Sequence, residues 1–115
     1  LFSKGHYIDI LLEHNISGLI VQTMGAGHVP EECMLSLKRA VDKQVPVVIT
    51  SRCFSGKLFT NTYGYKGSEK DLRDIGAIFS DWLPTSKARI KLIVMLSAGL
   101  NYERIKTNFE KHFYQ

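Results

Sequence analysis

The sequence predicts an α/β fold, with a small, mostly parallel sheet of three to four strands flanked by helices. Short apolar segments rich in β-branched residues, typical of strands buried on both faces, alternate with longer segments of helical periodicity. This alternation is typical of helices packed on a parallel sheet. The 115 residues fit one small domain, and no linker or internal repeat divides the chain.

Three segments have the character of strands. They are Gly18–Gln22, Val45–Thr50 and Ile75–Phe79. Pro46 stands near the start of the second segment, where a proline is tolerated. Three strands make a thin sheet, so we expect either a fourth strand before Leu1 or a partner that completes the sheet.

Five segments predict helices. They are Tyr7–Glu13, Pro30–Lys43, Glu69–Asp74, Thr85–Ala98 and Tyr102–His112. Pro30 suits a first helical turn, Gly99 a C-cap and Asn101 an N-cap. Helical spacing predicts that these side chains point inward: Ile8, Leu11 and Leu12; Met34, Leu37 and Val41; Ala88, Leu92 and Met95; Ile105 and Phe109.

Charge and composition narrow the range of functions. The net charge is +4 and the pI about 9.1, but the basic residues are spread among acidic ones without a nucleic-acid-binding motif, so we expect a solvated surface. No apolar run approaches the roughly 20 residues that cross a bilayer. Cys33 and Cys53 favour a reduced, intracellular protein, and the four histidines lack metal-ligand spacing. We therefore expect no metal, no cofactor, no nucleic acid and no membrane.

Ligands of open parallel sheets bind beyond the carboxyl ends of the strands, which here selects the loops 23–29 and 51–65. The turn Gly25-Ala-Gly27-His28 precedes a helix, where backbone N–H groups can face an anion; alternatively, its glycines serve only a tight turn. His28 is an acid–base candidate or a surface residue. Thr60–Lys66 offers a nucleophile–base set or a structured loop. The residues alone indicate a binding or assembly module without a complete active site.

Several motifs together resemble the C-terminal half of bacterial L-asparaginases, in order and with matching spacing over nearly the whole chain. They are Gly18-Leu-Ile-Val, Gly25-Ala-Gly-His-Val-Pro30, Val45-Pro-Val-Val-Ile-Thr-Ser-Arg-Cys53, Gly56, Thr62-Tyr-Gly-Tyr, Gly76-Ala-Ile-Phe and Lys87-Ala-Arg-Ile-Lys-Leu92. The resemblance implies a cofactor-free amidohydrolase that converts L-asparagine, or in some members L-glutamine, to the amino acid and ammonia. Its catalytic threonine and Thr-Asp-Lys cluster belong to an N-terminal domain, so residues 1–115 are expected to be an inactive C-terminal fragment.

The resemblance also implies roles for particular positions. Gly25, Gly27, His28 and Tyr63 would lie near the substrate of the neighbouring subunit across an intimate dimer. Secreted members have asparagine at His28 and glutamate at Tyr63, so the chain is more similar to the cytosolic branch, and we expect a cytoplasmic protein. Some cytosolic members bind a regulatory asparagine near positions matching Gln22 and Cys53, although Gln22 replaces the usual arginine.

Alternatives remain open on function and on assembly. The chain could instead be the asparaginase-like subunit of a tRNA-dependent amidotransferase, or a small α/β dimerisation or anion-binding domain. Residues 90–96 are apolar on nearly every side of their helix. Either the last helix covers the second face through Ile105 and Phe109, or that face belongs to the interface of a homo-oligomer, a dimer or tetramer.

Overall fold

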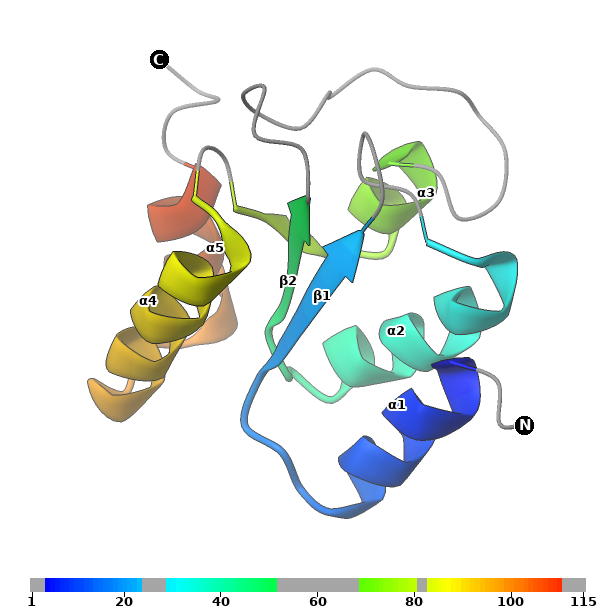
Figure 1. Cartoon of the computed structure of the whole chain (residues 1–115). Coiled ribbons are helices and arrows are strands. Elements are labelled where there is room, and N and C mark those ends of the chain that lie inside the picture. The colour runs from blue at the N-terminus through cyan, green and yellow to red at the C-terminus, as the bar shows by residue number, and fades with distance from the viewer. Residues whose placement is uncertain (1–3, 24–28, 52–68, 81–82, 111–115) are drawn as a thin grey trace.

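The computed structural model describes residues 4–23, 29–51, 69–80 and 83–110, which form three layers (Figure 1). A parallel sheet lies between two layers of helices, as the sequence predicts. The elements in chain order are α1 (Lys4–Glu13), β1 (Leu19–Thr23), the 3₁₀ helix η1 (Glu31–Cys33), α2 (Met34–Asp42), β2 (Val47–Ser51), α3 (Glu69–Asp74), β3 (Ile78–Phe79), α4 (Thr85–Ser97) and α5 (Tyr102–Glu110).

The sheet has the order β1-β2-β3, and both pairings are parallel. Leu19 pairs with Val47, and Ile49 pairs with Phe79. Successive strand residues point to opposite faces, so the apolar side chains of the sheet are divided between two cores. This explains why the strands are continuous apolar runs rather than alternating ones.

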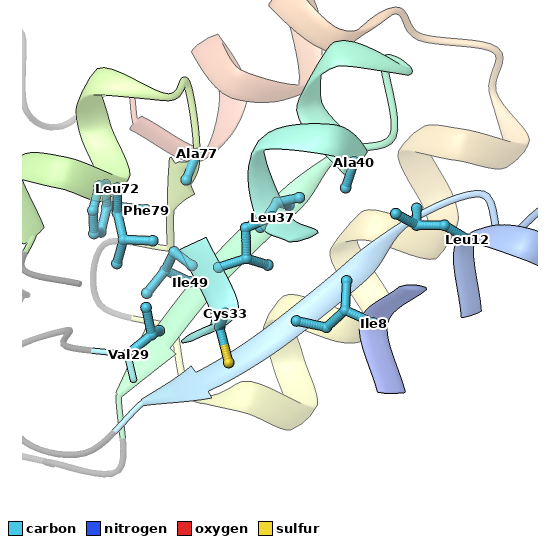
Figure 2. Close-up of a cluster of buried hydrophobic side chains, with 11 residues drawn as sticks. Ile8, Leu12, Val29, Cys33, Leu37, Ala40, Ile49, Leu72, Ala77 and Phe79 are labelled. Carbon is cyan, nitrogen blue, oxygen red and sulfur yellow. The ribbon is translucent and has the colours of Figure 1, made fainter. Parts of the chain in front are cut away.

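The first core fills the space between the sheet and α1, α2 and α3 (Figure 2). Its buried members are Ile8, Leu12, Val29, Cys33, Leu37, Ala40, Val47, Ile49, Leu72, Ala77 and Phe79. The second core lies on the opposite face, under α4 and α5. Its buried members are Val48, Ile78, Ala88, Leu92, Met95, Tyr102, Ile105 and Phe109. The inward-facing residues predicted for α4 and α5 are therefore confirmed.

In two helices of the first layer, the residues that are buried differ from those predicted to point inward. Leu11 is 40% exposed, because the core-facing line of α1 contains only Ile8 and Leu12. In α2, the fully buried Ala40 was not predicted to face inward. Small residues are needed on this side because α1 packs directly against α2. Helical spacing identified the sheet-facing side of α2 but not its second packing partner.

Helix ends follow the local signals that the sequence predicts. The Asn101 side-chain oxygen accepts a 2.9 Å hydrogen bond from the N–H of Arg104, which is an N-cap. After α4, Gly99 has φ +77°, and the N–H groups of Gly99 and Leu100 donate to the carbonyls of Leu96 and Met95. This pattern is a Schellman C-cap. The sequence signal at Gly99 is therefore confirmed.

The predicted strand Ile75–Phe79 is shorter in the structure, where only Ile78 and Phe79 pair with β2. Gly76 has φ +97°, and the N–H of Ala77 donates to the carbonyl of Leu72 at 3.0 Å. Ile75 and Gly76 thus cap α3 in the same way as Gly99 caps α4. The apolar segment Ile75–Phe79 therefore contains the cap of a helix followed by a strand. Hydrophobic periodicity alone cannot distinguish these two parts.

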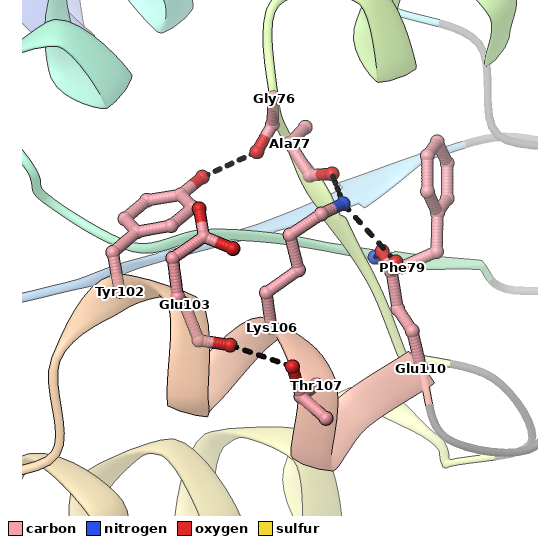
Figure 3. A network of polar contacts seen from close by, with 8 residues as sticks. All are labelled: Gly76, Ala77, Phe79, Tyr102, Glu103, Lys106, Thr107 and Glu110. Carbon is pink, nitrogen blue, oxygen red and sulfur yellow. Dashed lines mark hydrogen bonds and ion pairs between the residues drawn. The ribbon is translucent and has the colours of Figure 1, made fainter.

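The outer edge of β3 is closed by side chains of α5 (Figure 3). The Tyr102 hydroxyl donates to the Gly76 carbonyl at 2.6 Å, and the N–H of Phe79 donates to Glu110 Oε2 at 2.8 Å. Lys106 Nζ lies 3.1 Å from Glu110 Oε1 and 3.5 Å from the Ala77 carbonyl. These three α5 side chains, spaced four residues apart on one face of the helix, therefore bind the main-chain groups of the β3 edge that another strand would otherwise bind.

In the ranges that the structure describes, no helix is long and apolar enough to cross a membrane.

The C-cap of α2 offers a direct test of backbone strain, because Gln44 has φ +63° at the position that glycine occupies after α4. Gln44→Gly should stabilise the protein by about 0.5–1 kcal/mol, since glycine adopts this conformation without a clash. Gly99→Ala should cost about 1 kcal/mol by strain alone, because a Cβ at this position has no atom within 4 Å. Urea unfolding of both variants measures the two changes in the free energy of unfolding. Changes of the same sign in the two variants would contradict the strained left-handed conformation assigned to Gln44.

Tyr102 should give stability a dependence on alkaline pH. Burial, and then the nearby carboxylates of Glu110 and Glu103, raise the pKa of Tyr102 from 10.0 to about 12. The stabilisation is complete below the unfolded-state pKa and is lost as the pH rises through the folded-state pKa, on the order of 1–2 kcal/mol after allowance for solvent screening.

Tyr102→Phe should cost about 1 kcal/mol at neutral pH, because the Gly76 carbonyl loses its donor. The difference in unfolding free energy between the wild type and this variant should then shrink toward pH 11–12, as expected from the pKa of about 12. Urea titrations at neutral and alkaline pH measure this difference. A difference that does not change with pH would show that the hydroxyl is not shielded in the folded state.

Candidate functional site

The carboxyl end of β1 lies beside an open groove of about 560 Å³. The groove runs along β1 and is bordered by the start of α1 and by the segment that leads into η1. Its lining residues are Tyr7, Ile8, Leu19, Ile20, Val21, Gln22, Thr23, Val29, Pro30 and Cys33. The loops 23–29 and 51–65, where ligands were expected because the sheet is open and parallel, lie mostly outside the described residues, and the groove shares only Thr23 and Val29 with them.

Most of this lining is apolar, which limits what the groove can bind. The side chains of Val29 and Cys33 are buried and belong to the first core. The Thr23 hydroxyl is also buried, and it donates to the Thr50 carbonyl at 2.8 Å. A small, zwitterionic amino acid needs several polar partners, so this groove by itself is a poor site for one.

Hydroxyl groups connect the carboxyl ends of the strands to α4. Thr50 Oγ1 lies 2.7 Å from Thr85 Oγ1 in the first turn of α4, and Ser80 Oγ donates to the Leu83 carbonyl at 3.2 Å. These partners are carbonyls or another hydroxyl, and none is a base that could activate a nucleophile. In the described part of the chain, these hydroxyls therefore join elements rather than form a catalytic set. Sequence reasoning missed them, although each follows an apolar strand or begins a helix.

Charged groups near α1 are also structural. Arg39 Nη1 of α2 lies 2.7 Å from Asp9 Oδ1 of α1, and this contact lowers the pKa of the Asp9 carboxyl, with a smaller effect of Ser36. The described residues include no group of three or more histidine, cysteine or acidic side chains that could hold a metal ion. The Arg39 side chain is 55% exposed and the Asp9 side chain 38%, so this pair joins α1 to α2 but adds little to the stability of the fold.

Of the residues predicted for the site, only Gln22 lies in the described ranges. Gln22 is exposed near the end of β1, pairs with Thr50 in the sheet register and lines the groove. The remaining candidates, Gly25, Gly27, His28, Cys53 and Tyr63, lie outside the described residues, as does the segment 60–66. The described geometry therefore tests neither the substrate-proximal positions nor the pairing of Gln22 with Cys53.

Comparison with known proteins identifies one family. The family described as Glutaminase/Asparaginase C-terminal domain matches residues 3–109. The L-asparaginase of Bacillus licheniformis is 33% identical over 98 residues, which are 85% of this chain and 30% of that protein. A glutamyl-tRNA(Gln) amidotransferase subunit of Pyrococcus abyssi is 32% identical over 100 residues, which are 86% of this chain and 22% of that protein.

The fold has close counterparts among solved structures. L-asparaginase I of Vibrio cholerae superposes with a TM-score of 0.77 at 30% sequence identity, covering 94% of this chain and 32% of that one. The chain thus spans about a third of the length of the asparaginases that it matches.

The contact between Thr50 and Thr85 should be energetically coupled. Thr85→Val should cost about 1–2 kcal/mol, because it leaves the fully buried Thr50 hydroxyl without its partner. Thr50→Val should cost less, since the half-buried Thr85 hydroxyl can bind water. Urea unfolding of the two single variants and the double variant forms a thermodynamic cycle, in which the double variant should cost less than the sum. Strict additivity would contradict a direct hydrogen bond.

Proposed function

Because this chain belongs to the glutaminase/asparaginase family as its C-terminal domain, we propose that it serves in a longer amidohydrolase that converts L-asparagine to L-aspartate and ammonia. The catalytic threonine would belong to an N-terminal domain. The C-terminal domain described here would complete the substrate side of the active site of a neighbouring subunit. The match over residues 3–109 carries the proposal, because it includes residues 24–28 before η1 as well as the core.

The hydroxyl groups of the described residues support a catalytic role for the N-terminal domain and a positioning role for this one. The strand-end hydroxyls of Thr23, Thr50 and Ser80 are all buried and bonded within the fold. A domain with this arrangement can position a loop and offer a surface, but its described residues supply no activated nucleophile. We assign the substrate-proximal role to Gly25, Gly27, His28 and Tyr63. Gln22 and Cys53 are assigned to a regulatory subsite.

Assembly into a homo-oligomer is part of the proposal. Ile90, Ile93 and Val94 of α4 are 62%, 50% and 61% exposed, while Ile105 and Phe109 of α5 are buried. The last helix therefore covers one side of α4 and leaves an apolar strip. Such a strip favours contact with a second subunit or with the N-terminal domain.

The amidotransferase relatives provide the second candidate function, an asparaginase-like subunit that acts within a tRNA-dependent amidotransferase. The match in Pyrococcus abyssi, at 32% identity, supports it. Its similarity to this chain is comparable to that of the Bacillus licheniformis asparaginase. The two functions would be separated by assaying ammonia release from free asparagine, which only the first requires.

A cytoplasmic location is also proposed. The chain has only two cysteines, Cys33 and Cys53, too few for the disulfide framework of a secreted domain.

The segment 24–28 before η1 is the part of the proposal that mutation can test. In the longer enzyme, Gly27→Val should raise the KM for asparagine by about tenfold or more, a loss of about 1.4 kcal/mol of binding, while the Tm changes little. Gly99→Ala is the matched control, since it should lower the Tm by strain at an exposed cap without changing KM. The 115-residue chain alone should release no ammonia. A collapse of the Tm of Gly27→Val with a normal KM would show that the turn is only structural.

A further inference from the structure

A line of hydrogen bonds runs across the carboxyl ends of β1 and β2 to the start of α4. The Thr23 hydroxyl donates to the Thr50 carbonyl at 2.8 Å, and Thr50 Oγ1 lies 2.7 Å from Thr85 Oγ1. Thr23 is the last residue of β1, Thr50 is the last but one of β2, and Thr85 is the first of α4. Three threonines therefore join two strands and a helix at one end of the sheet.

The line of hydrogen bonds passes from one face of the sheet to the other. Leu19 and Val21 pack on the first core, so alternation along β1 places the side chain of Thr23 on the same face. Val48 belongs to the second core, and the side chain of Thr50, two residues later, points to α4 on that face. Because the Thr50 carbonyl accepts from Thr23, the position of α4 is connected through β2 to the end of β1.

Packing alone does not explain why hydroxyl groups occupy these positions. Thr23 and Thr50 are 3% and 0% exposed, whereas the buried residues earlier in β2 are valine and isoleucine. Valine has nearly the shape of threonine, and replacing both partners of a buried hydrogen bond by apolar groups of the same shape can be nearly neutral for stability. What valine lacks is direction, because apolar contacts are non-directional whereas a hydrogen bond fixes a distance and an angle. The threonines therefore supply a constraint on geometry more than a gain in stability.

This constraint acts where the chain leaves the sheet. Thr23 and Ser51 pair in the sheet register, and residues 24 and 52 follow them directly in the sequence. Under the proposed function, the segments that begin there contain the residues assigned to the substrate side of the site, which are Gly25, Gly27, His28 and Tyr63. Ligands of open parallel sheets bind beyond this end, and productive binding is sensitive to displacements of about 1 Å. Substrate binding would consequently depend on the relative position of the two strand ends.

We propose that Thr23, Thr50 and Thr85 are positioning residues for the binding of asparagine. They hold the last residues of β1 and β2 in one arrangement against α4, and they act on the substrate only through the segments that follow these strands. Because the catalytic threonine would belong to another domain, loss of the hydrogen bonds should raise KM more than it lowers kcat. The inference rests on the proposed function and identifies the part of the fold that sets the substrate side of the site.

Steady-state kinetics and thermal unfolding of the longer enzyme test the proposal. Thr85→Val should raise the KM for asparagine about tenfold, as expected for a small displacement of binding groups, and should lower the Tm, because the Thr50 hydroxyl loses its partner. Thr85→Ser retains a hydroxyl and should keep KM near the wild-type value. The double variant Thr50→Val, Thr85→Val leaves neither hydroxyl unbonded, so it should recover most of the Tm but keep the raised KM. A purely structural role would restore KM together with the Tm.

Tyr102→Phe is the matched control, because it also removes one hydrogen-bonding hydroxyl, whose acceptor is the Gly76 carbonyl before the start of β3. This variant should lower the Tm without changing KM. If the wild type releases ammonia from asparagine, three results would each overturn the proposal: an unchanged KM in Thr85→Val, recovery of KM in the double variant, or failure of the double variant to fold. A wild type that releases no ammonia from asparagine would instead reject the proposed function, and this inference with it.

Discussion

Burial of β2 is the constraint on which the other elements depend. Val47, Val48, Ile49 and Thr50 have no exposed surface, so both faces and both edges of this strand must be covered. Strands β1 and β3 bind its edges, α2 and α3 cover one face, and α4 covers the other. Because backbone groups of a buried strand must be bonded, the neighbouring strands are as necessary to β2 as the apolar side chains.

The same constraint explains why polar groups gather at the carboxyl ends of the strands. Apolar side chains occupy the middle of the sheet, and hydroxyls begin where the strands leave it, at Thr23, Thr50 and Ser80. Each hydroxyl is used to hold an element in place. In the proposed amidohydrolase, a domain organised in this way would contribute to catalysis through its loops and its surfaces, while its described interior is structural. This division agrees with membership of a family in which the matched domain is about a third of the protein.

Sequence reasoning predicted the features that depend on local chemistry. The extent of α3 at Glu69–Asp74, the N-cap at Asn101 and the cap at Gly99 follow from single residues and short periodicities. It did not predict features that depend on tertiary contacts. Ala40 is buried in the first core, to which α1, α2 and the sheet all contribute. The buried Glu110 carboxylate accepts a hydrogen bond from the N–H of Phe79, 31 residues earlier in the chain. Similarly, the positive φ of Gln44 has no signal in its residue type. Of the candidate site, only the position of Gln22 can be compared with the structure.

The closure of β3 by α5 also limits how copies of this domain can polymerise. Edge-to-edge growth of a sheet into a filament requires two free edges on every copy, because each new copy must bind the previous one and still offer an edge to the next. Glu110 and Tyr102 occupy one of these edges. Within the described residues, α5 therefore removes one of the two free edges that growth of the sheet into a filament would require.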